Sequence, residues 1–193
     1  MSKLKNKRLY IVVALLLCAA SVSASFAIFS SWKTAENNLY VGHNEIEIEE
    51  DFAPPPELGQ DTTFRKTVKV RNTGNVPCYV RVFADFSDSE VRDVAQFSAD
   101  GETFMSVGDY QAAIRERDWV YDPDTSYYYY TVPVQPGDAT PVLFHSVQVK
   151  FPNEQSVREF RIIVSAESIQ TADADGVEID DYAEAWKTFL SEH

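Results

Sequence analysis

Hydrophobic and polar residues alternate along much of the chain, and this period of two predicts β-strands with one buried face. Residues 45–49 alternate glutamate with isoleucine, which predicts a strand with one solvent-exposed, acidic face. Residues 64–70 and 78–86 each place apolar side chains on one parity, and residues 72–75 between them carry turn chemistry. These two segments therefore predict a β-hairpin.

The same alternation continues through the second half of the chain. Residues 119–121 and 127–132 are rich in aromatic and β-branched side chains and flank a turn at 122–126, which predicts a second hairpin. Residues 142–151 and 160–166 predict further strands after a Pro-Gly turn. Short strands separated by turn signals are typical of an antiparallel sandwich.

Helical spacing is confined to short stretches. Ser89 is expected to cap a short helix that carries Val91, Val94 and Ala95, and a second helix is expected over residues 112–117. Residues 180–190 predict a terminal helix with Tyr182 and Trp186 on one face. The predicted fold class is all-β: an antiparallel jelly-roll-like sandwich with short helical insertions and a C-terminal helix.

The start of the chain predicts an export signal. Lysines and an arginine precede an apolar run over residues 9–20, and Ser25-Phe26-Ala27 fits a signal-peptidase site. We expect cleavage between Ala27 and Ile28 and a secreted product in the extracellular matrix or at the cell surface. A retained membrane anchor is the alternative, and it would be the chain's only membrane contact.

Charge limits the classes of partner that the protein can bind, and cysteine content indicates the state of Cys78. The formal net charge is −13, and loss of the four cations before the cleavage site takes it to −17. Such a surface repels nucleic acid, so no nucleic-acid partner is expected. Cys78 is then the one remaining cysteine, and its place among apolar strand residues predicts a buried side chain.

No catalytic constellation is apparent. The three histidines form no zinc-protease motif, and the sequence carries neither a Gly-x-Ser-x-Gly elbow nor a phosphate-binding glycine loop. The acidic run over residues 173–181 lacks the spacing of a calcium loop and is interpreted as a solvated linker. We predict no enzyme activity, no catalytic residue, no bound metal and no cofactor.

Four consecutive tyrosines form the most distinctive motif in the predicted domain. In a strand, Tyr127, Tyr128, Tyr129 and Tyr130 place two rings on each face. One pair would fill the core while the other stays partly exposed as a candidate interface. The alternative is a strand covered by the chain's own loops.

Several segments, in order, resemble the TasA/camelysin-like proteins, exported matrix-fibre subunits of Gram-positive bacteria. The resemblance covers most of the chain and rests on these segments: Ser25-Phe26-Ala27-Ile28-Phe29, Asn38-Leu39-Tyr40-Val41-Gly42, the acidic strand 45–50, the run 69–75, the tyrosine strand before Pro136-Gly137, and Ala166-Glu167-Ser168-Ile169-Gln170.

The resemblance implies a subunit of an extracellular biofilm-matrix fibre that polymerises with itself. In such fibres the N-terminal segment of one subunit adds as a strand to the next, a form of β-augmentation. The donor would begin at Ile28 and carry Ile28, Phe29, Trp32 and Leu39 as anchors. The implied partners are further copies, a SipW-type signal peptidase and other matrix proteins.

These expectations divide the chain into four parts. Residues 1–27 form the signal peptide, 28–44 the candidate donor segment, 45–170 the sandwich domain, and 171–193 the acidic linker with the C-terminal helix. Two other functions remain open: a camelysin-like secreted metalloprotease, and a membrane-anchored adhesin or binding module.

Overall fold

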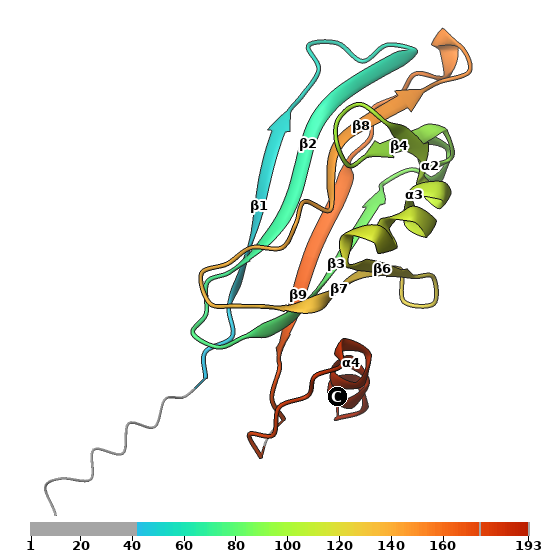
Figure 1. Ribbon diagram of the computed structural model, residues 1–193. Helices are drawn as coiled ribbons and strands as arrows, with labels where there is room; N and C mark the ends of the chain where they lie inside the picture. The colour runs from blue at the N-terminus through green and yellow to red at the C-terminus, as the bar shows by residue number, and fades with distance from the viewer. Residues whose placement is uncertain (1–41, 174, 193) are drawn as a thin grey trace, which may run out of the picture. The chain divides into compact units, whose positions relative to one another are not determined.

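The computed structural model describes residues 42–173 and 175–192, and within them nine strands form two antiparallel sheets (Figure 1). The strands are β1 (Ile46–Ala53), β2 (Asp61–Asn72), β3 (Cys78–Phe86), β4 (Ala95–Ser98), β5 (Phe104–Ser106), β6 (Trp119–Asp122), β7 (Tyr127–Val134), β8 (Phe144–Lys150) and β9 (Ile162–Gln170).

The strand order is β1-β2-β8-β4-β5 in one sheet and β6-β7-β3-β9 in the other. Every pairing between these strands is antiparallel, and β6 and β7 form the predicted hairpin with Trp119 opposite Tyr130. The two sheets bury one hydrophobic core between them, to which β2, β3 and β8 each contribute fully buried valines. The predicted antiparallel sandwich is confirmed.

The first predicted hairpin is wrong. The parity of its strands is correct, because Val68 and Val70 of β2 and Val80 and Val82 of β3 are fully buried. However, β2 pairs with β1 and β8, whereas β3 pairs with β7 and β9. The turn after Asn72 therefore carries the chain across the core to the facing sheet.

That crossing is held by a compact set of hydrogen bonds. The Asn72 side chain donates to the carbonyls of Val76 and Val134 and accepts from the Gly74 amide. Gly74 is packed so closely that a Cβ there would lie 2.2 Å from the His43 carbonyl oxygen. Glycine is thus required at position 74 because the backbone before β1 lies so close, and not because of a positive φ.

Short helices fill the connections on one side of the sandwich. The first short helix is present as α2 (Ser89–Val94), with Asp88 rather than Ser89 as its N-cap. Helix α3 (Val107–Ala113) is capped by Ser106 and followed by a 3₁₀ turn (Ile114–Arg117), so the second helix starts earlier than predicted. Both bury apolar residues against the core.

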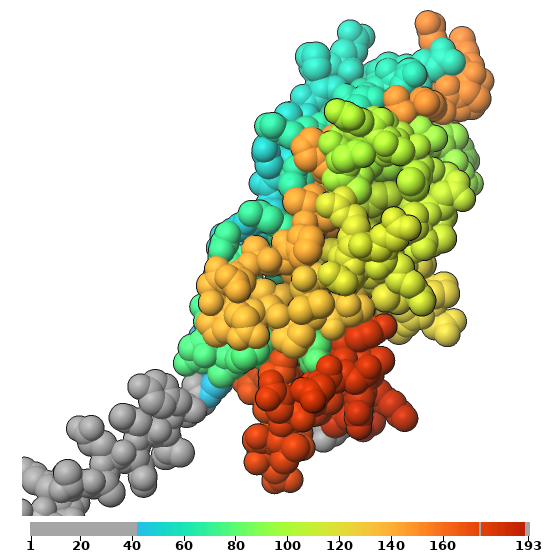
Figure 2. Space-filling model, viewed as in Figure 1, coloured from blue at the N-terminus to red at the C-terminus, as the bar shows by residue number. Residues whose placement is uncertain are grey.

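Helix α4 (Tyr182–Glu192) packs on the outer face of the β6-β7-β3-β9 sheet. Its Ala185 and Trp186 join Tyr79, Tyr129 and Ile169 in a second, smaller hydrophobic cluster. Figure 2 shows the C-terminal segment, in red, gathered beside the end of the sandwich where β9 ends. The predicted terminal helix is confirmed, two residues later than expected.

Candidate functional site

The most distinctive surface is the side of the sandwich where β1 ends one sheet and β9 ends the other. Neither strand has a further strand hydrogen-bonded to its outer edge within the described part of the chain. The two lie close to each other, one from each sheet (Figure 1). We call this region the open side. It offers unpaired backbone donors and acceptors, which are the groups that a further strand would bind.

Burial of inward-facing side chains falls sharply at the open side. Val68 and Val147, on interior strands, have 0 % of their surface exposed. Ile46 and Ile48 of β1 face the same core but are only partly buried, as are three residues of β9: Ile162, Val164 and Ala166. The core therefore reaches solvent along this side, as it would where a covering strand is missing.

One end of the open side widens into an apolar pocket of about 430 Å³. We call it the aromatic pocket; it is lined chiefly by Phe52, Leu58, Phe64, Phe160 and Ile162. The Phe52 and Phe64 rings meet edge to face with centroids 5.9 Å apart, yet 51 % of Phe52 is exposed. A large apolar side chain entering this pocket would cover those rings.

A buried cation lies at the wall of the aromatic pocket. Lys66 shares the inward parity of β2, and its side chain is 8 % exposed. Its Nζ lies 2.9 Å from Glu50 Oε2 and 5.2 Å from the centre of the Phe52 ring. The ion pair and the ring together satisfy the ammonium at the boundary of the core.

The opposite end of the open side is closed by the residues that precede β1. Asn44 donates from Nδ2 to the Ser168 carbonyl and accepts a hydrogen bond from the Ser168 hydroxyl, both at 3.0 Å. The Gln170 side chain donates to the Gly42 carbonyl at 3.3 Å. Residues 42–44 thus run beside the last part of β9.

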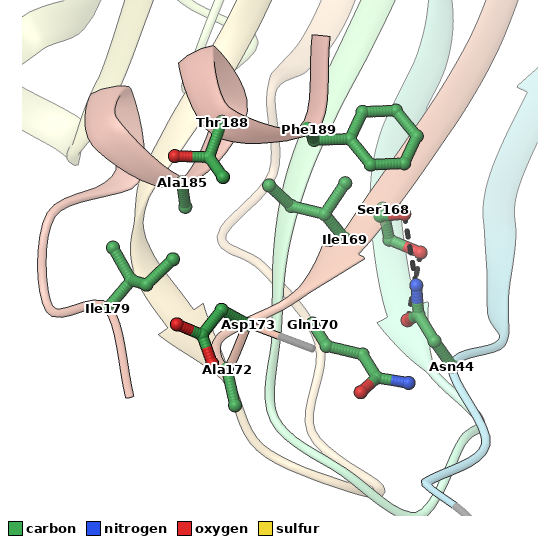
Figure 3. Close-up of a pocket in the computed structure, with 10 residues that line it drawn as sticks. All are labelled: Asn44, Ser168, Ile169, Gln170, Ala172, Asp173, Ile179, Ala185, Thr188 and Phe189. Atoms are coloured by element: carbon green, nitrogen blue, oxygen red, sulfur yellow. Dashed lines mark hydrogen bonds between the residues drawn. The ribbon is translucent and has the colours of Figure 1, made fainter. Parts of the chain in front are cut away.

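A second, more polar pocket of about 330 Å³ lies beside this closed end (Figure 3). Figure 3 shows Thr188 and Phe189 of α4 above Ile169 of β9, with Asn44, from the segment that precedes β1, reaching Ser168. Its walls come from α4, β9 and the lead-in to β1. The two ends of the open side therefore differ: one is aromatic and open, and the other is polar and flanked by residues 42–44.

The tyrosine run is divided between the two faces, but its outer face is not exposed. Tyr128 and Tyr130 face the main core, while Tyr127 and Tyr129 lie on the face that α4 covers. Tyr128 and Tyr129 are buried and the other two are half-buried. Of the expected partly exposed pair, Tyr127 is half-buried and Tyr129 is buried, because the C-terminal helix rather than a loop packs there.

Arg81 holds this covered face together. Its guanidinium lies 4.2 Å from the centre of the Tyr127 ring and 4.3 Å from that of Trp186. It also donates to Glu167 and to the Tyr129 hydroxyl. Burial raises the pKa of Glu167, but the hydrogen bonds from Arg81 and Tyr127 outweigh it and the net pKa is lowered. The carboxylate stays ionised opposite the arginine.

The remaining chemically reactive residues form no site. Cys78 is fully buried in the core, as predicted, and this burial raises its pKa to about 11. His145 lies in β8 against the Ser146 hydroxyl, and His43 lies near Glu45 at the surface. Among the described residues, no three His, Cys, Asp or Glu side chains are grouped so as to hold a metal ion.

Several predicted residues lie outside the part of the chain that the structure describes. These are the cleavage residues Ala27 and Ile28 and the donor anchors Phe29, Trp32 and Leu39. In the described residues, no helix has the length and apolar character needed to cross a membrane. The donor and cleavage assignments stay predictions.

Sequence reasoning missed the aromatic pocket. Phe52 and Leu58 border the proline-rich segment between β1 and β2, where periodicity carries no signal. Phe160 belongs to a predicted strand, but alternation does not indicate which distant residues it meets. The acidic residues of β1 form ion pairs with four cations of β2: Glu49 pairs with Lys69 and Arg71, Glu50 with Lys66, and Asp51 with Arg65. A pocket built from such separate segments appears only after folding.

A scan of protein-family models found no match to this chain, and a search of curated proteins found none either. The function is therefore argued from the geometry of the open side.

Proposed function

We propose that the protein is an exported structural subunit of an extracellular matrix fibre, which polymerises when the N-terminal segment of one copy adds as a strand to another. The observation that carries the proposal is the open side. Two edge strands face each other there, and five inward-facing apolar side chains are only half-buried. An added strand would pair the free backbone groups and cover those side chains.

Charge and composition agree with this role. The formal net charge of the full chain is −13, and removal of the four cations before Ile28 makes it −13 − 4 = −17. This charge makes separate copies repel each other, so assembly requires a specific, directional contact rather than nonspecific association. The segment over residues 28–41 carries one acid and one lysine among apolar and small polar residues. That segment can therefore approach an acidic neighbour with little added repulsion.

The test compares two forms of the purified protein, one beginning at Ile28 and one at Gly42. All described strands lie after Gly42, so both forms retain the sandwich. We expect the longer chain to form filaments in negative-stain electron microscopy and to sediment as large species as its concentration rises. The shorter chain should remain a monomer.

A matched control carries residues 28–41 in shuffled order, with length, charge and composition unchanged. It should assemble poorly, because strand addition depends on the order of inward-facing and outward-facing side chains. Filaments from the shortened chain, equal to those from the longer one, would show that assembly does not use this segment. Mass spectrometry of the exported protein should find Ile28 as its first residue.

A further inference from the structure

The open side has a direction, and this direction determines how a donor segment would lie. One end carries the aromatic pocket beside the start of β9, and the other carries Asn44 and Gly42 against the last residues of β9. Since Gly42 is at the closed end, the preceding residues start from there. From Asn44 beside Ser168 to Gly42 beside Gln170, the described chain runs towards the last residue of β9 and away from the aromatic pocket.

A segment that leaves one copy in this direction would reach the aromatic pocket of a second copy placed end to end with the first. It would then run from the neighbour's aromatic pocket towards its closed end, so its residues nearest Gly42 would enter first. Read from N- to C-terminus, such a strand is antiparallel to β9 and parallel to β1. Antiparallel pairing is slightly the more stable, so β9 is the favoured partner.

Resting on the function proposed above, we propose that residues 28–41 of one copy lie antiparallel to β9 of a second copy, with the Leu39 end in the aromatic pocket and the Ile28 end towards Gln170.

Length and chemistry support this arrangement. The nine residues of β9 span roughly 30 Å, and fourteen extended residues span roughly 45 Å, so the segment can cover the strand and bridge two copies. Leu39 brings an apolar side chain to a pocket lined by Phe52, Phe64 and Phe160. Donor and acceptor surfaces differ, so the contact is head-to-tail and leaves each end of a chain of copies open.

Disulfide trapping between two forms of different length tests the orientation. The donor form begins at Ile28 and carries one added cysteine, Leu39→Cys or Phe29→Cys. The acceptor form begins at Gly42, cannot donate, and carries Phe52→Cys or Gln170→Cys. Both acceptor positions are exposed, and the native Cys78 is buried. A disulfide needs the two Cα atoms within about 7 Å, so it reports proximity.

We expect a cross-linked heterodimer on a non-reducing gel from Leu39→Cys with Phe52→Cys and from Phe29→Cys with Gln170→Cys. The other two combinations, Leu39→Cys with Gln170→Cys and Phe29→Cys with Phe52→Cys, should give no heterodimer band. A reversed pattern, or no heterodimer while the unmodified longer chain still forms filaments, overturns the orientation and leaves the fibre proposal intact. Failure of the longer chain to form filaments overturns the fibre proposal itself.

Two further outcomes separate other occupants of the open side. A single longer chain with both Leu39→Cys and Phe52→Cys should not close an internal disulfide at high dilution; if it does, the segment occupies its own sandwich and the proposal is wrong. Leu39→Asp should reduce filament formation, whereas the neighbouring Asn38→Asp should not. Equal effects of the two substitutions would also contradict the proposal.

Discussion

Replacing Trp186 with alanine should release helix α4 from the sheet. Trp186 is 2 % exposed and lies in the small cluster with Tyr79, Tyr129 and Ile169. Its ring meets Tyr129 edge to face at 5.8 Å and the Arg81 guanidinium at 4.3 Å. The substitution therefore removes most of what connects the helix to the sheet.

The magnitude follows from these contacts. Truncating a buried tryptophan to alanine costs about 3–5 kcal/mol. The cation–π contact with Arg81 contributes up to about 2 kcal/mol of this, because the guanidinium is only 9 % exposed. The cluster is small and separate from the main core, so the loss cannot exceed the free energy of docking α4. We expect about 3 kcal/mol, which raises the undocked fraction roughly a hundredfold.

Hydrogen–deuterium exchange followed by mass spectrometry measures this release. Peptides from α4 should exchange roughly a hundredfold faster in Trp186→Ala, while peptides from β2 and β8 change little, because they belong to the main core. The control is Leu190→Ala on the same helix, where the side chain is 47 % exposed. Equal exchange of α4 in the two variants would show that Trp186 does not hold the helix.

Two further predictions concern the sheet and its crossing turn. The Glu49 carboxylate accepts hydrogen bonds from Arg71, which lower its pKa from 4.5 to about 2, so its stabilising effect is complete above pH 4.5 and is lost as the pH falls to about 2. Glu49→Gln should thus lower stability to urea at pH 7 but not near pH 2, whereas Glu47→Gln on the same face should matter little at either pH. Gly74→Ala should cost about 1–3 kcal/mol in urea unfolding, because its Cβ would meet a backbone oxygen at 2.2 Å. Gly108→Ala should leave the free energy of unfolding unchanged or raise it, because a Cβ there meets nothing within 4 Å. An equal loss of stability in the two alanine variants would refute the close contact between Gly74 and His43.

Strand positions could be predicted because each strand repeats a physical pattern over many residues. In β2, every second residue from Thr62 to Asn72 is buried, and this reflects the alternation of side chains across a pleated strand. The β6–β7 hairpin was also predictable, since turn residues join two aromatic strands that pair directly. The inward parity of a strand is a local property.

Strand partners could not be predicted in the same way. The sequence from Asn72 to Asn75 contains turn residues, but such a turn can either join two paired strands or carry the chain to the opposite sheet. The choice depends on Gly74 packing against His43, which is distant in the sequence. Likewise, nothing near Tyr129 indicates that Trp186 covers it.

The candidate site was predictable only in part. Residues 45–49 were correctly recognised as a strand, but its position at the edge follows from the order of all nine strands. The aromatic pocket joins Phe52 to Phe160, over a hundred residues apart, so it depends on tertiary structure alone. Periodicity identifies which side chains face inwards and not which of them remain uncovered.

The way that β1 is anchored bears on how the domain carries mechanical load. Eight consecutive residues of β1 pair with β2, from Ile46 opposite Asn72 to Ala53 opposite Arg65. Tension applied to the chain at Gly42 acts along the length of this ladder. Its hydrogen bonds are then loaded together in shear instead of being unzipped one after another. A pull on the N-terminal segment would thus be borne by the whole β1–β2 pair, with the ion pairs of Glu49 and Asp51 acting as additional cross-links between the two strands.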